Sequence, residues 1–292
     1  MIITALIGKP TSHSVSPELF ALYAKEFNLE YSHLKIDVES KNLSSSLSAI
    51  KKLNFKGLNV TLPLKSKIIK YMDMVDPEAK AIGAVNTVVN IEGKLLGYNT
   101  DSYGAITTIK QRVKKLKNTA VLVLGTGGAS RALVFGLLKE GAIVTVAFRK
   151  PKSDRTMSML KDFRNKVNFI ENSEYNLAKN TATSQIICNA TSCGMNPEMN
   201  QSPLSLEVLR SAAKSSDLSQ KLFFDVIFNP YKTLFLNNAF KFKANIQGGT
   251  EMMIYQGVKA FKLWTGYQVS SKTIKIAKNI LKNQLEKKGH EK

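Results

Sequence analysis

The sequence predicts an α/β protein of about two domains, one of them a doubly wound domain built on a parallel sheet. Its 292 residues exceed the length of one domain of typical size. From residue 120 to residue 227, short apolar runs alternate with helical stretches, a pattern typical of a parallel sheet covered by helices on both faces. A glycine-rich turn directly follows the first of these runs.

The chain is strongly basic, with 42 Lys and Arg against 22 Asp and Glu and a formal net charge of +20. Nucleic-acid binding is therefore one hypothesis, because a basic surface attracts phosphate backbones of any sequence. The basic residues are nevertheless spread along the whole chain, and no basic motif interleaved with aromatic residues is present. We expect a lysine-rich solvated surface that helps collect anionic small-molecule substrates, and no nucleic-acid partner.

Neither a membrane segment nor a metal site is indicated by the sequence. No stretch approaches the roughly 18 apolar residues of a membrane span, and residues 1–8 lack the basic start of a secretory signal. The two cysteines have no second pair with which to form a zinc site, and the three histidines are scattered: Cys188, Cys193, His13, His33 and His290. We expect a cytoplasmic protein with reduced thiols, no metal and no membrane contact.

The N-terminal segment predicts strands at 2–7, 31–38 and 58–62 and helices at 17–27 and 43–53. Three serines, Ser12, Ser14 and Ser16, stand just before the first helix. Serine at such a position most often caps the helix. Alternatively, Ser14 and Ser16 lie two apart on an extended loop, point the same way and bind a carboxylate.

Lys65 falls in the first turn of a helix predicted over residues 64–72. The N-terminal end of a helix disfavours a positive charge, so a lysine there is a candidate proton-transfer group. The competing interpretation is one exposed lysine among many.

A hairpin is predicted next, with strands at 84–90 and 94–98 joined by a glycine-containing turn. A hairpin centred near Glu92 places Asn86 roughly opposite Tyr98, so its open end collects Asn86, Thr100 and Asp101. These residues either form a polar site or serve as a turn asparagine and a cap for the helix predicted from residue 102 to about 116.

The glycine turn at residues 125–128 joins an apolar strand, 120–124, to an amphipathic helix. Gly125 permits the tight turn, and Gly127 lets a ligand approach the free N–H groups at the start of the helix. That ligand is an anion, most simply a dinucleotide pyrophosphate. Ser130 replaces the third glycine of the usual motif, so a glycine turn without a nucleotide remains an alternative.

The segment after the glycine turn predicts strands at 143–148, 167–170, 185–190 and 222–227 and helices at 154–163 and 204–213. The second strand of an NAD-specific domain ends near an acidic residue, whereas this chain has Arg149, Lys150 and Lys152 there. A guanidinium with a nearby amine suits a 2′-phosphate, which favours NADP. After this segment, a helix is predicted that follows residues 229–233 and ends near residue 242, and then a short strand at 244–247. Two more helices are predicted, one at about 250–264 and one from about residue 270.

Together these residues resemble the shikimate dehydrogenase family. Eight blocks match in the family's order and span nearly the whole chain: 14–16, 59–65, 83–87, 97–101, 125–129, 189–194, 225–233 and 249–256. The resemblance implies an α/β substrate-binding catalytic domain from residues 1–101 and 249–292, with a doubly wound Rossmann-type NADP-binding domain, residues 102–248, inserted in it. The substrate site would lie in the cleft.

The activity implied by the resemblance is the reversible, NADPH-dependent reduction of 3-dehydroshikimate to shikimate in chorismate and aromatic amino acid biosynthesis, by a monomer or homodimer. Lys65 and Asp101 match the catalytic pair, and Asp101 also contacts substrate. The other implied substrate-binding residues are Ser14 and Ser16 for the carboxylate, and Thr61, Asn86 and Gln256 for the ring hydroxyls. The implied NADP-binding residues are Gly125, Gly127, Gly128, Ala129, Arg149, Lys150, Thr191, Ile227 and Gly249.

Three residues depart from the family pattern. The family's Asn-Arg-Thr at the NADP phosphate is Phe148-Arg149-Lys150 here, Phe228 replaces a tyrosine, and Met253 replaces a leucine. The nearest alternative is accordingly a relative with relaxed substrate choice that accepts quinate, or one that uses NAD.

Overall fold

The computed structural model describes residues 1–12 and 14–290, apart from the side chains of residues 287–290. The chain divides into two compact units, residues 1–104 with 254–281, and residues 105–253 with the chain from Lys282 onward. His13 and the His290 side chain, two of the scattered histidines, lie outside the described parts. Across those parts, no group of three or more His, Cys, Asp or Glu side chains is placed to hold a metal, and no helix is long and apolar enough to cross a membrane.

Six strands form the sheet of the first unit among the described residues, in the order β2-β1-β3-β5-β6-β4. Their bounds are Ile2–Gly8 (β1), Tyr31–Asp37 (β2), Gly57–Val60 (β3), Met74–Val75 (β4), Thr87–Ile91 (β5) and Lys94–Tyr98 (β6). β1 runs parallel to β2 and β3, whereas β5 is antiparallel to both β3 and β6. β3 and β6 therefore end at the same edge of the sheet, where β5 begins.

The hairpin register differs by one residue from the prediction. Tyr98 pairs with Thr87, not Asn86, because the turn contains two residues between the pair Ile91 and Lys94. Glu92 and Gly93 both have positive φ, 51° and 83°, as a two-residue hairpin turn requires. Asn86 therefore directly precedes β5 at the open end.

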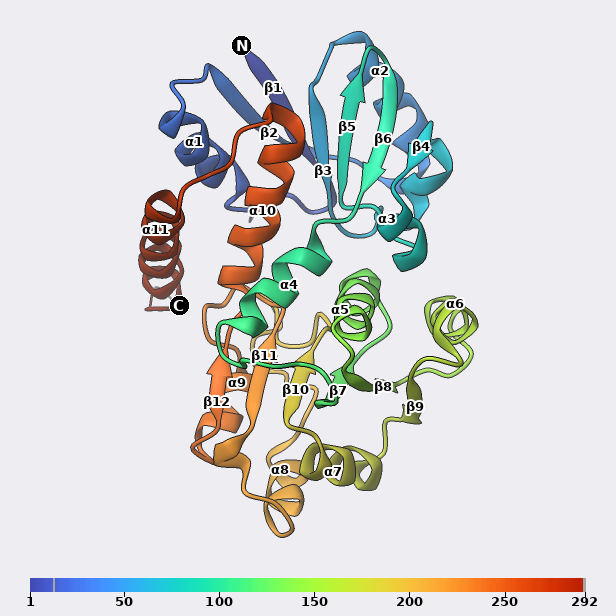
Figure 1. The fold of residues 1–292 in the computed structure, drawn as a ribbon, viewed down its shortest axis with the longest axis vertical. Helices are drawn as coiled ribbons and strands as arrows, with labels where there is room; N and C mark the ends of the chain where they lie inside the picture. Colours follow the sequence, from blue (N-terminus) through green and yellow to red (C-terminus); the bar gives the residue numbers. More distant parts are fainter. Residues whose placement is uncertain (13, 291–292) are drawn as a thin grey trace. The chain divides into compact units, whose positions relative to one another are not determined.

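The helices of the first unit cover both faces of its sheet. Their bounds are Ser16–Glu26 (α1), Leu43–Lys52 (α2), Pro77–Ile82 (α3) and Thr250–Thr265 (α10), with 3₁₀ turns at Ser40–Asn42 and Lys67–Tyr71; α11, Ser271–His290, follows α10. α2 and α3 pack on one face, around Ile7 and Leu58. α10 lies on the other face (Figure 1). There its Trp264 lies beside Phe20 of α1 and donates from Nε1 to the carbonyl of Val88 at 2.9 Å.

Trp264 explains the glycine at position 57. A Cβ on Gly57 would lie 2.2 Å from Trp264 Nε1, so only glycine lets the indole approach β3 this closely.

The predicted helix over residues 64–72 is wrong. Turns lead into the 3₁₀ segment Lys67–Tyr71, and burial of Leu64 and Ile68 against the sheet holds this short segment in place. α4 was also predicted too long, since it spans Asp101–Lys110. The missed helix α3 has clear signals, because the Asp76 side chain caps it and Gly83, with φ 71°, ends it.

The second unit has a fully parallel six-stranded sheet within the described residues, in the order β12-β11-β10-β7-β8-β9. The strand bounds are Ala120–Leu124 (β7), Ile143–Phe148 (β8), Asn168–Glu171 (β9), Ile186–Asn189 (β10), Leu222–Asp225 (β11) and Asn245–Gln247 (β12). The chain starts in the centre at β7, winds outward through β8 and β9, then returns and winds the other way. This is the doubly wound order of dinucleotide-binding domains, and the predicted fold class is confirmed.

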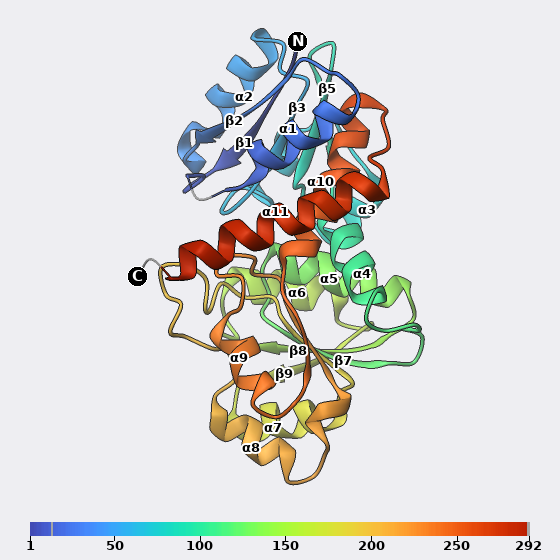
Figure 2. The same cartoon turned by 90° about the vertical axis from the view of Figure 1, so that its left-hand side faces the viewer.

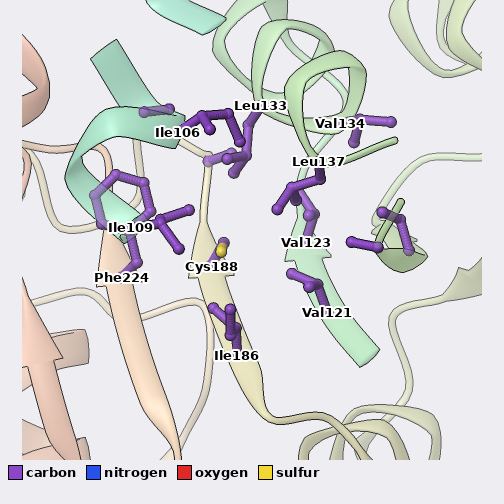
Figure 3. Close-up of a cluster of buried hydrophobic side chains, with 14 of the residues drawn as sticks. Ile106, Ile109, Val121, Val123, Leu133, Val134, Leu137, Ile186, Cys188 and Phe224 are labelled. Carbon is purple, nitrogen blue, oxygen red and sulfur yellow. The ribbon is translucent and has the colours of Figure 1, made fainter. Parts of the chain in front are cut away.

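Helices lie on both faces of this parallel sheet, as Figure 2 shows. α4, α5 (Gly128–Lys139) and α6 (Asp154–Phe163) cover one face; α7 (Glu174–Thr183), α8 (Leu206–Ala213) and α9 (Leu234–Phe240) cover the other, and a 3₁₀ turn spans Leu218–Gln220. Along β7, Val121 and Val123 join the cluster drawn in Figure 3, while Leu122 and Leu124 join the opposite one. Because both faces are buried, the strand reads as a continuous apolar run.

Candidate active site

The first polar site lies at the sheet edge where β3 and β6 end and β5 begins. Lys65 Nζ donates to Asp101 Oδ2 at 2.6 Å, and the two side chains are 18% and 8% exposed. Lys65 lies in the turns after β3, so the helix-dipole argument for its reactivity does not apply. A different contact holds its backbone in place, since the amide of Val85 donates to the Lys65 carbonyl at 2.8 Å.

Asp101 begins α4 but does not cap it. The side-chain oxygen of Asn99 accepts from the amides of Asp101 and Ser102, at 3.0 and 3.3 Å. The Asp101 carboxylate is therefore available to the site, with Oδ2 on Lys65 and Oδ1 accepting from Asn86 Nδ2 at 2.8 Å. The sequence analysis missed Asn99, although an asparagine two residues before a helix-starting aspartate is a capping signal.

Asn86 is fixed in one orientation by its partners. Its side-chain oxygen accepts from the amide of Thr100 at 2.7 Å and from the hydroxyl of Thr87 at 3.1 Å, so its amino group faces Asp101. Gln256 joins the same network, because the Thr100 hydroxyl donates to its side-chain oxygen at 3.3 Å. Lys65, Asp101, Asn86 and Gln256 are thus brought together by one buried network.

Ser14 and Ser16 form a separate hydroxyl pair, 2.9 Å apart. Neither is the N-cap of α1, which is Val15 with no side-chain cap. Thr61 follows β3, and a Cβ on the neighbouring Gly8 would lie 2.4 Å from its methyl carbon. Within the described residues, these three hydroxyl side chains make no hydrogen bond to Lys65 or Asp101.

The second site lies at the switch point of the parallel sheet, between the neighbouring parallel strands β7 and β10. After β7 the chain continues to β8 on one side, and after β10 it continues to β11 on the other. A Cβ on Gly125, whose φ is 109°, would lie 2.8 Å from the methyl carbon of Thr191, so the loops after the two strands are in contact. Ligands of doubly wound sheets bind at such points.

The start of α5 suits a phosphate. Gly127 is its N-cap. Among the described residues, no side-chain cap bond is made there, and a Cβ at Gly127 would meet no atom within 4 Å. Open space therefore faces the amides of Gly128 and Ala129. Ser130, in place of the third glycine, is fully buried and donates to the carbonyl of Gly125 at 2.6 Å, which closes the turn.

A buried polar network holds the loops after β10 and β11. The Asn189 side-chain oxygen accepts from the amide and hydroxyl of Thr191, at 3.0 and 2.7 Å, and its amino group lies 3.2 Å from both Asp225 oxygens. Asp225 also accepts from the Ile227 amide at 2.9 Å and from the Thr233 hydroxyl at 2.6 Å. Burial raises the pKa of Asp225 to about 6, although these hydrogen bonds act in the opposite direction.

Gly249 is joined to the same loops. Its amide donates to the Ile227 carbonyl at 3.0 Å, and a Cβ there would lie 2.3 Å from the carbonyl oxygen of Val226. Asn189 and Asp225 were missed as site residues, although a polar residue at the end of each of two apolar strands was a usable signal.

Arg149 and Lys150 lie on the exposed loop between β8 and α6. The Lys150 carbonyl accepts from both the amide and the hydroxyl of Ser153, the N-cap of α6, at 3.3 and 3.2 Å. The two cationic side chains therefore stand in solvent on a loop with a fixed backbone.

A doubly wound unit with a phosphate-type glycine turn, together with a partly buried lysine–carboxylate pair, defines the class of dinucleotide-dependent oxidoreductases. Residues 6–88 match the family model described as shikimate dehydrogenase substrate binding domain, and residues 249–274 match that described as shikimate 5′-dehydrogenase C-terminal domain. The shikimate dehydrogenase (NADP(+)) of Methanococcus aeolicus is 37% identical over 97% of this chain and 96% of its own. This chain belongs to the shikimate dehydrogenase family, as the sequence predicted.

Solved structures agree with this assignment. Shikimate 5-dehydrogenase from Thermus thermophilus, in complex with NADP(H) and shikimate, has a TM-score of 0.83 at 33% identity and covers 96% of this chain and 100% of its own. The Listeria monocytogenes enzyme, in complex with shikimate and NAD, has a TM-score of 0.83 at 29% identity and covers 96% of each chain.

Proposed function

We propose that this protein catalyses the reversible, NADPH-dependent reduction of 3-dehydroshikimate to shikimate in aromatic amino acid biosynthesis. Membership of the family supports the reaction, and so does the name shared by its full-length relatives. The structural observation that carries the proposal is the partly buried ion pair between Lys65 and Asp101, 2.6 Å apart. A binding protein without catalysis has no need of such a pair.

Lys65 is the proton donor in this proposal. As the ketone becomes an alcohol, negative charge develops on the C4 oxygen, and the ammonium stabilises this charge and delivers the proton. Asp101 holds the amine in position and contacts the substrate, while Asn86 fixes the carboxylate through its 2.8 Å hydrogen bond. When bound, the reduced nicotinamide supplies the hydride.

The remaining substrate contacts come from hydroxyl and amide side chains of the first unit. We assign the carboxylate to the paired hydroxyls of Ser14 and Ser16, because two donors at 2.9 Å spacing match two carboxylate oxygens. Thr61, Asn86 and Gln256 are assigned to the ring hydroxyls, which need partners that can both donate and accept.

The residues of the second unit fit NADP. The open N-terminus of α5 would hold the pyrophosphate through Gly125, Gly127, Gly128 and Ala129, and Arg149 with Lys150 would hold the 2′-phosphate. Thr191, Ile227 and Gly249 would line the remainder of the coenzyme site. Residues 1–101 and 249–292 are assigned to substrate and residues 102–248 to NADP. The division into compact units supports the boundaries near residues 101 and 249, whereas it groups the chain from Lys282 onward with the second unit. We further propose that the enzyme is cytoplasmic and acts as a monomer or homodimer.

A second candidate is a dehydrogenase that accepts quinate or uses NAD. Phe148 and Phe228 replace residues that the family uses at the coenzyme phosphate and near the substrate, and the Listeria relative is in complex with NAD.

The test is NADPH oxidation by the purified protein with 3-dehydroshikimate, repeated with NADH and run in reverse with shikimate and with quinate. We expect turnover with NADPH and shikimate and little with NADH or quinate. Comparable rates with NADH or quinate would favour the second candidate, and a folded protein without turnover on any pair would refute both. Lys65→Met is the control that separates turnover by this enzyme from a contaminant.

A further inference from the structure

Helices α5 and α6 are joined by an ion pair that the proposed reaction does not use. Arg131 of α5 donates from Nη2 to Asp162 Oδ2 of α6, and its other terminal nitrogen lies 3.4 Å from the Ser158 hydroxyl. The guanidinium carbon also lies 5.4 Å from the centre of the Phe163 ring. Arg131 is only 6% exposed, although burying a guanidinium is costly. The contacts on α6 compensate for that cost.

A chain of hydroxyls joins the N-terminal ends of the same helices. Thr126, in the glycine turn, lies 3.2 Å from the Thr156 hydroxyl in the first turn of α6. The Ser153 hydroxyl lies 2.9 Å from that of Thr156 and 3.2 Å from the carbonyl of Lys150. The chain therefore runs from the glycine turn to the basic loop that carries Arg149.

We propose that Arg131 and Asp162 are positioning residues for coenzyme selection: by docking α6 on α5 they set the distance between the glycine turn and the basic loop. This inference rests on the proposed use of NADP. Within one coenzyme molecule the pyrophosphate and the 2′-phosphate are a fixed number of bonds apart, so their two sites must keep a matching separation. Loss of the ion pair lets α6 and its loop move, which weakens the 2′-phosphate contact and leaves the pyrophosphate contact on α5 in place.

The test measures binding of 2′,5′-ADP and 5′-AMP by calorimetry, because these probes differ only in the 2′-phosphate. In Arg131→Gln and Asp162→Asn we expect the preference for 2′,5′-ADP to fall about tenfold, the scale of one lost charged hydrogen bond, with 5′-AMP binding unchanged. The ratio of kcat/KM for NADPH to that for NADH should fall by the same factor, and Arg131→Lys should restore part of it. Glu207→Gln is the control, since it removes an exposed ion pair with Arg210 in the same unit and should change nothing.

Equal weakening of both probes would overturn the proposal, because it would mean that α5 itself is disturbed. An unchanged preference would also overturn it. If Arg131→Gln does not fold, two other variants test the docking of α6 on α5. Asp162→Asn removes the charge of the half-exposed carboxylate that pairs with Arg131, and Thr156→Val breaks the chain of hydroxyls. A wild-type protein with no preference for 2′,5′-ADP would instead refute the proposed use of NADP, and the inference with it.

Discussion

Replacing Asp101 by asparagine should impair turnover by displacing Lys65. The carboxylate serves two donors, Lys65 Nζ at Oδ2 and Asn86 Nδ2 at Oδ1, whereas an amide has one oxygen. Asn86 cannot rotate, because its own oxygen already accepts from Thr100 and Thr87. The amide oxygen at position 101 must therefore face Asn86, which leaves its amino group opposed to the Lys65 ammonium.

The magnitude follows from the lost contact. A hydrogen bond between charged partners contributes about 1.5–3 kcal/mol, which corresponds to roughly 10- to 150-fold in kcat. Lys65→Met removes the proton donor itself and should lower kcat by roughly 10²- to 10⁴-fold. Because Asp101 affects kcat mainly through Lys65, we expect Asp101→Asn to slow the Lys65→Met enzyme by a much smaller factor than it slows wild type.

The assay is steady-state NADPH oxidation by wild type, both single variants and the double variant. Glu39→Gln is the control, since Glu39 forms an equally short but exposed ion pair with Lys9, 2.6 Å, in the same unit. If Asp101→Asn slows the Lys65→Met enzyme by the same factor as wild type, Asp101 acts on the substrate independently, and this reasoning is refuted.

Three further predictions concern coenzyme affinity and stability. Gly127→Ala should keep the wild-type melting temperature but weaken NADPH binding, because its methyl group enters the empty space before α5. Unchanged affinity for NADPH would show that no coenzyme phosphate binds beside residue 127. His33 is buried with its Nε2 unpartnered among the described residues, and burial lowers its pKa to about 3. The contribution of the neutral imidazole to the unfolding free energy is therefore complete above the unfolded pKa of 6.5 and is lost as the pH falls below it. Relative to His33→Leu, wild type should lose roughly 2–3 kcal/mol of unfolding free energy between pH 6.5 and 4.5, measured with urea; a constant difference would contradict the lowered pKa. Trp264→Phe should lower the unfolding free energy by about 2–4 kcal/mol, because it leaves the buried Val88 carbonyl unpaired and a space beside Gly57; a loss below about 1 kcal/mol would show that the indole contact is replaced.

Elements with strong local signals were predicted well from the sequence. β8 and α6 have the bounds expected, since β8 is an apolar run and Ser153 is a conventional N-cap for α6. The segment after Pro63 was predicted wrongly because its apolar residues are compatible with a helix, and only packing against the sheet selects the shorter 3₁₀ turn.

The site was less accessible to sequence reasoning than the fold. Lys65 and Asp101 are 36 positions apart, and only the order of β3, β5 and β6 brings them together. The local argument for Lys65 invoked a helix that does not form, while the resemblance to a family identified the same residue. No local sequence pattern indicated the role of Arg131, because its partner on α6 is 31 positions away.

The packing of Trp264 against β3 and β5 affects how the chain folds during synthesis. Gly57 and Val88 leave the ribosome long before Trp264, 176 positions after Val88, can cover them. The part of the first unit's sheet that α10 covers therefore stays exposed while residues 105–253 are made. Contacts of such long sequence separation slow folding and prolong exposure to aggregation. A circular permutant that begins at α10 would let this helix cover β3 and β5 as soon as they are made.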